Sequence, residues 1–133
     1  MKKILVLLLI LLSHQVMSQA VIGYTPPQLR EKFPNVSWEY GKWGPEGDKT
    51  MMMMIWRSDE MVVNYFFNKN NVTESCTIVP LTQGILQGMV EKYNNRYVIV
   101  DKQTWRFYND GTIFLCKLKA LDTGVFYFWW TEE

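Results

Sequence analysis

The chain has 133 residues, of which 48% are hydrophobic and 15% aromatic, with 14 Lys and Arg against 13 Asp and Glu. This length fits a single domain with a modest core. The balanced charge, without a basic cluster, excludes nucleic acid as an expected partner, because phosphate binding relies on gathered Lys and Arg side chains.

The first 18 residues have the pattern of a secretory signal peptide. Lys2 and Lys3 precede the apolar run 4–12, and small or short side chains, Val16 and Ser18, occupy the minus-three and minus-one positions before a cut after Ser18. A run of this length matches export signals, whereas a membrane-spanning helix needs roughly 20 apolar residues. We expect cleavage after Ser18 or, alternatively, after Ala20, and a periplasmic or extracellular location in a bacterium. The predicted organisation is a signal peptide at 1–18 and one domain at 19–133, without a transmembrane segment after cleavage.

The chain contains one histidine, His14, which lies in this N-terminal segment. A mature chain cut after residue 18 therefore has no imidazole. Its composition excludes hydrolases that use a histidine base and argues against the common zinc sites. No cofactor motif is present, so the sequence predicts a protein that is not an enzyme and holds no cofactor or metal.

Two helices are predicted. Thr25-Pro26-Pro27-Gln28 combines a capping threonine, an early proline and a glutamine three residues after the cap, so a short helix should run to about Phe33. Thr82 is the expected cap of the second helix, whose apolar residues recur at three- and four-residue spacing until about Asn94.

Strand-like segments follow the helices, separated by short polar or glycine-containing turns. Segment 36–49 is predicted to be a long irregular loop, with a short strand before it as an option. The order helix, strands, helix, strands predicts an α+β fold in which an antiparallel β-sheet carries two helices on one face. The expected strands are 51–56, 61–67, 72–79, 96–100, 104–108, 112–118 and 125–130.

In this outline the chain resembles the helix-plus-antiparallel-sheet modules of β-lactamase-inhibitor-like and related small exported bacterial proteins. The resemblance implies an architecture and assigns no residue a role.

Two degenerate helix-plus-strands repeats are also predicted. The sequence EKFPN at 31–35 resembles EKYNN at 91–95, and Phe67 precedes Cys76 by the same spacing at which Phe107 precedes Cys116. The two matches have different offsets, so a duplication requires an insertion in the first half or a deletion in the second.

Strand alternation predicts that Cys76 and Cys116 both point toward the helices. In an exported protein these residues could form a disulfide, and two buried free thiols are the alternative. The run Met51–Met54 is predicted to be a core strand. A copper site of thioether ligands is the less favoured interpretation, because alternation divides the four sulfurs between two faces.

The aromatic residues suggest a function. The run 125–130 is aromatic on both faces, so one set must point away from the helices. Tyr, Trp and Arg are enriched at the centres of protein interfaces. The sequence therefore predicts a small exported non-catalytic binding module that recognises a protein or an envelope component. Its predicted binding residues are Trp38, Trp43, Phe66, Arg106, Tyr108, Tyr127 and Trp129.

Two alternatives remain open. The first is a carrier that holds an apolar small molecule between helices and sheet, which the aromatic and methionine content favours. The second, less favoured, is a glycan hydrolase that uses two carboxylates, for which Glu39, Glu46 and Asp48 are the candidates because they lie near aromatic residues.

Overall fold

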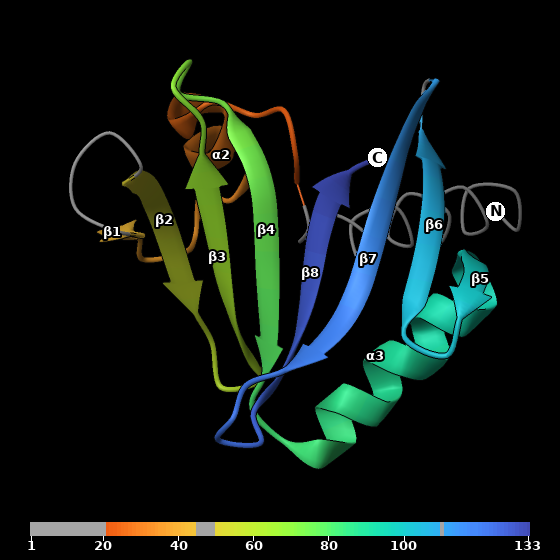
Figure 1. The fold of residues 1–133 in the computed structure, drawn as a ribbon. Helices are drawn as coiled ribbons and strands as arrows, with labels where there is room; N and C mark the ends of the chain where they lie inside the picture. The colour runs from red at the N-terminus through yellow and green to blue at the C-terminus, as the bar shows by residue number, and fades with distance from the viewer. Residues whose placement is uncertain (1–20, 45–49, 110) are drawn as a thin grey trace, which may run out of the picture.

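The computed structural model describes residues 21–44, 50–109 and 111–133 (Figure 1). The predicted signal peptide and its cleavage sites lie outside this part of the chain, as do Glu46 and Asp48. Two helices and eight strands are present in the described part. They are α2 (Pro26–Lys32), β1 (Glu39–Trp43), β2 (Met51–Arg57), β3 (Met61–Phe67), β4 (Thr73–Pro80), α3 (Gln83–Arg96), β5 (Val98–Asp101), β6 (Thr104–Asn109), β7 (Thr112–Ala120) and β8 (Phe126–Glu132).

All eight strands belong to one antiparallel sheet with the order β1-β2-β3-β4-β8-β7-β6-β5. Each helix precedes four strands, and the last strands of the two sets, β4 and β8, pair at the centre of the sheet (Figure 1). The fold is therefore the α+β class that the sequence predicts, with an antiparallel sheet and two helices.

Both helices begin where the capping signals place them. The backbone N–H of Thr25 donates to Oε1 of Gln28 at 2.9 Å before α2. The hydroxyl oxygen of Thr82 accepts from the backbone N–H of Ile85 at 3.2 Å before α3. Helix α3 continues to Arg96, slightly beyond the predicted end at Asn94, because asparagine disfavours a helix interior only weakly.

The two helices pack on the same face of the sheet and cover different halves of it. The ring centroid of Phe33, at the end of α2, lies 6.0 Å from that of Trp56 and 6.3 Å from that of Tyr65. Tyr93 of α3 lies 4.9 Å from Phe128 and 5.5 Å from Trp130, nearly edge-on to each. The core between helices and sheet is thus largely a layer of interlocked aromatic rings.

The predicted loop at 36–49 is wrong in part, because Glu39–Trp43 forms edge strand β1 beside β2. A second correction concerns strand alternation at the start of β4. The register shifts at Glu74, which lies between the paired residues Thr73 and Ser75. Strict alternation counted back from Cys76 predicts Val72 on the helix side, but with this shift Val72 lines the opposite face.

Of the two alternatives for the cysteines, the structure shows the second: Cys76 and Cys116 are buried thiols that are not joined by a disulfide. Trp130 of β8 is the register partner of Cys76 on one side and of Cys116 on the other. Because neighbouring strands lie about 4.8 Å apart, the two cysteine Cα atoms are roughly 10 Å apart. A disulfide requires about 4.4–6.8 Å, so an intervening strand prevents the bond.

Within the described ranges, none of the helices has the length and apolar character needed to span a membrane.

Candidate binding surface on the open sheet face

The face of the sheet that the helices leave uncovered contains a hollow of about 1060 Å³, which we call the open-face hollow. Its lining comes mainly from β1, β2, β3, β4 and β8, with Lys119 contributed by β7. The hollow therefore spans the first half of the sheet and crosses the central β4–β8 junction.

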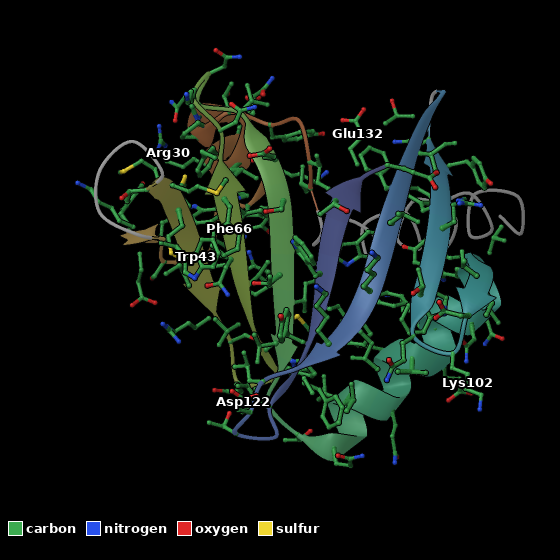
Figure 2. The ribbon with its side chains drawn as sticks, in the orientation of Figure 1. Arg30, Trp43, Phe66, Lys102, Asp122 and Glu132 are labelled. Atoms are coloured by element: carbon green, nitrogen blue, oxygen red, sulfur yellow. The ribbon has the colours of Figure 1, made fainter. Side chains whose placement is uncertain are left out.

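Four aromatic side chains line the open-face hollow. On one side, the rings of Trp43 and Phe66 meet nearly edge-on, with their centroids 5.6 Å apart (Figure 2). On the other side lie Tyr127 and Trp129 of β8. Nζ of Lys119 lies 4.0 Å from the centroid of the Trp129 ring, which is close enough for a cation–π attraction. Alternation along β8 explains this placement, because Phe128 and Trp130 are buried against the helices and the intervening residues point away.

The floor between these aromatic walls consists of short, uncharged polar side chains. Nδ2 of Asn64 donates to Oγ1 of Thr77 at 2.9 Å across strands β3 and β4. Ser75 of β4 is the register partner of Thr131 on β8, and both line the hollow. These amide and hydroxyl groups can donate and accept hydrogen bonds, so the floor suits a polar, uncharged backbone or hydroxyl-rich ligand.

Charge is distributed unequally along the hollow. Glu74 and Glu132 lie at the end where β4 begins and β8 finishes, and both belong to the lining. Lys119 lies at the opposite end, where it is the register partner of Tyr127. The two salt bridges found in the described part of the chain involve other residues. Glu132 follows the buried Trp130 by two positions and is the register partner of Phe114, so it borders the hollow at its end from the helix-side set of β8.

The structure brings together four of the seven predicted binding residues, namely Trp43, Phe66, Tyr127 and Trp129. Trp38 is not among them. It lies on the helix side, where its ring is 5.8 Å from that of Tyr65, and it contributes to the core.

Arg106 and Tyr108 occupy the open face but lie away from the hollow. Arg106 of β6 is the register partner of Leu115 on β7, which is in turn the partner of Thr131 on β8, so β7 lies between Arg106 and the hollow. Nη2 of Arg106 donates to Oε1 of Glu133 at 2.6 Å. This hydrogen bond raises the pKa of Arg106, so the guanidinium stays charged and is engaged with the C-terminal residue.

The sequence prediction missed several lining residues. Met51 and Met53 line the hollow, whereas Met54 is buried on the other face, so the predicted core strand describes only one side of β2. Strand alternation through Met51–Met54 already predicts that Met51 and Met53 share one face and that Met52 and Met54 share the other. Gly41, on β1, leaves room for Met53, because a Cβ there would lie 3.3 Å from the Met53 Cγ, which is closer than an ordinary contact. Lys119 gives no distinctive signal in the sequence.

Among the described residues, the two thiols and Glu39 are each held in a structural environment. Burial raises the pKa of the Cys76 and Cys116 thiols, which keeps them protonated and poorly nucleophilic. Of the carboxylates suggested for glycan hydrolysis, Glu39 accepts a hydrogen bond from Nε of Arg57 at 2.6 Å. In the described residues, no three His, Cys, Asp or Glu side chains gather where they could hold a metal ion.

Comparison of the chain with protein-family models, with curated proteins and with solved structures gave no match.

Proposed function

We propose that the mature chain is a small exported, non-catalytic binding module that recognises a protein through its open-face hollow. The observation that carries this proposal is the gathering of Trp43, Phe66, Tyr127 and Trp129 around an uncovered polar floor. Tyr and Trp combine a large contact area with a polar atom, which is why they dominate the energetic centres of protein interfaces.

The size of the hollow supports a macromolecular partner. It reaches across five neighbouring strands, which at about 4.8 Å per strand gives a width of roughly 20 Å. A standard protein interface buries about 800 Å² on each partner, and a patch of this width has the scale required. An envelope component is the competing ligand of the same surface, and the experiment below separates the two.

The carrier hypothesis receives less support. A ligand held between helices and sheet needs space there, but Tyr93 fills that layer by packing on Trp105, Phe128 and Trp130. A smaller hollow of about 410 Å³ beside α3 includes Leu86 and Val90 but is shallow and partly polar. Tryptophan emission that responds to a panel of fatty acids would restore the carrier to consideration.

We infer export from the N-terminal sequence, with the signal peptide at 1–18 and the mature domain at 19–133. Recovery of the protein from the periplasm or medium, with a mass that matches a start at residue 19 or 21, would support this. A mass that includes Met1–Ser18 would contradict it.

We further infer that the two helix-plus-four-strands halves derive from a duplication. The support is the order of elements and the pairing of the two final strands, β4 and β8. The sequence match around the cysteines does not contribute, because Cys76 lies in the fourth strand of its set and Cys116 in the third of its own. The hollow includes the junction between the two sets.

The test is capture of a partner by the immobilised mature protein from envelope and medium fractions of the cells that make it. The double variant W43A/W129A should lose the partner while its circular dichroism remains unchanged. The control R106A/Y108A should retain it, because those side chains lie beyond β7. Mass spectrometry of the captured material distinguishes a protein from an envelope glycan or lipid. Equal capture by W43A/W129A would remove the hollow as the binding site.

A further inference from the structure

We propose that Met51 and Met53, together with the Trp43 ring, form a binding site for Cu(I) on the β1–β3 side of the open-face hollow. The site goes beyond partner recognition and does not depend on it. It also departs from the sequence-based expectation that the chain holds no metal.

Two of the four sulfurs in the methionine run lie on the open face. Met51 and Met53 are half-buried and line the hollow. Alternation points Met52 and Met54 to the other face, where Met54 is buried. The Cα atoms of alternate residues in a strand are roughly 6.6 Å apart, and a methionine side chain has three rotatable bonds. Both thioethers can therefore reach one ion between them.

Two aromatic rings meet over the strand that carries these methionines. Trp43 of β1 is the register partner of Met51, and Phe66 of β3 is that of Met53. Strand β2 lies between β1 and β3, yet the two ring centroids are 5.6 Å apart, so the rings reach across β2 toward each other (Figure 2). A monovalent cation held by the sulfurs would lie beside these rings, whose faces attract cations.

Gly41 keeps space open at the Met53 side chain. It is the register partner of Met53, and a Cβ at this position would lie 3.3 Å from the Met53 Cγ and 3.5 Å from its Sδ. The Met53 sulfur therefore lies toward β1, the strand that carries Trp43. A larger residue in place of Gly41 would crowd the sulfur.

The type of ligand selects the ion. Thioethers are soft, uncharged ligands that favour Cu(I), whereas zinc is bound by thiolate, imidazole or carboxylate groups. Cys76 and Cys116 are fully buried, and burial raises the pKa of both thiols, so they stay protonated and do not compete for the ion. The residues that the structure describes contain no histidine. Cu(I) is therefore the ion that this part of the open face suits best.

The experiment is titration of the mature protein with Ag(I), a redox-stable probe of Cu(I) sites, and then with Cu(I) kept reduced by ascorbate under nitrogen. Binding is followed by calorimetry and by the ε-methyl NMR signals of the methionines. Met51→Leu/Met53→Leu removes both thioethers and nearly conserves volume, and Met53→Leu alone serves if the double variant does not fold. Met52→Leu is the matched control, because Met52 lies on the same strand, faces the other way and is 49% exposed.

We expect wild type and Met52→Leu to bind a single Ag(I), with the signals of Met51 and Met53 shifted and the other methionine signals nearly unchanged. Cu(I) should shift the same two signals. Met51→Leu/Met53→Leu should lose this binding while its circular dichroism stays the same. Trp43→Ala should bind about fivefold more weakly, the effect expected for one cation–π contact.

Several results would overturn the inference: no binding of Ag(I) or of Cu(I) by wild type, equal binding by wild type and the methionine double variant, or loss of binding in Met52→Leu. The thioethers of Met51 and Met53 would then only pack against the aromatic rings. Because the titration contains no partner, such a result would leave the proposed function standing, and partner capture tests that function separately.

Discussion

Cys76 and Cys116 lie in one row across the sheet, two strands apart, with Trp130 of the intervening strand between them. Both thiols are fully buried. Strand β8, which ends the chain, thus separates two residues that strand alternation places on the same face.

The first prediction concerns the state of these thiols. The mature protein, purified without reductant, should have the intact mass of two free cysteines, because the sheet holds the sulfurs too far apart to bond. Ellman's reagent should modify them slowly in buffer and at once in urea, since attack requires an exposed thiolate. A mass lower by two hydrogens would contradict this arrangement of strands.

The second prediction is a loss of stability at alkaline pH. Burial raises the pKa of both thiols, and burial also raises that of Tyr65. In the unfolded chain thiols titrate near pH 8.5 and tyrosines near pH 10. Below those values both states are protonated and stability is complete. Above them only the unfolded chain releases protons, so the free energy of unfolding should fall as pH rises.

For each thiol the fall approaches about 1.4 kcal/mol per pH unit above pH 9. Urea denaturation of wild type and Cys116→Ala between pH 7 and 10 measures it. The variant should be less stable at pH 7, because a small cavity remains, but its stability should depend less steeply on pH. If the free energy of unfolding fell equally with pH in wild type and in Cys116→Ala, then Cys116 would not be protonated in the folded protein or would not be buried.

The third prediction concerns the contact that fixes α3 to the sheet. Nε1 of the buried Trp105 donates to Oδ1 of Asn94 at 2.8 Å. Asn94→Ala should lower the free energy of unfolding by about 1–3 kcal/mol, because it leaves an indole N–H without an acceptor. Asn95→Ala is the matched control, since the neighbouring residue is also helical and exposed, and it should cost much less. Equal losses in the two variants would mean that the hydrogen bond contributes little.

Much of the fold could be predicted because its signals are local. At α2 the Gln28 side chain accepts from the backbone N–H of Thr25, and at α3 the Thr82 hydroxyl accepts from that of Ile85, so both capping bonds join residues three apart. Strand alternation places Trp105 and Trp130 on the helix side. The insertion of β8 between β4 and β7 could not be predicted this way. This insertion pairs segments that are far apart in the sequence, and no residue pattern around Cys76 or Cys116 predicts it.

The binding surface was predictable to a similar extent. Alternation along 125–130 was enough to group Tyr127 with Trp129 and to separate them from Phe128 and Trp130, while the packing of the helices decides which pair is covered. It could not place Arg106 relative to them, because the order of strands decides which open-face residues are neighbours. Trp38 precedes β1 and has no strand period to follow, so only the tertiary structure shows that it packs on Tyr65.

The fourth prediction compares two tryptophans that lie five residues apart on opposite sides of the sheet. Trp38 packs against Phe33 and Tyr65, whereas Trp43 is 60% exposed and lines the hollow beside Phe66. Trp38→Ala should lower the free energy of unfolding by about 2–4 kcal/mol, because it opens a cavity in the aromatic core. Trp43→Ala should cost less than about 1 kcal/mol, as expected for an exposed side chain.

For partner binding, the larger loss should occur in Trp43→Ala and the smaller in Trp38→Ala. At a temperature where both variants are folded, Trp38→Ala should bind as wild type does, and Trp43→Ala should bind at least about tenfold more weakly, as expected for an aromatic residue at the centre of an interface. Thermal denaturation and binding measured on the same samples give both comparisons. If Trp43→Ala instead destabilised the fold more than Trp38→Ala, the aromatic wall of the hollow would be part of the core, and the open face would lose its role as the recognition surface.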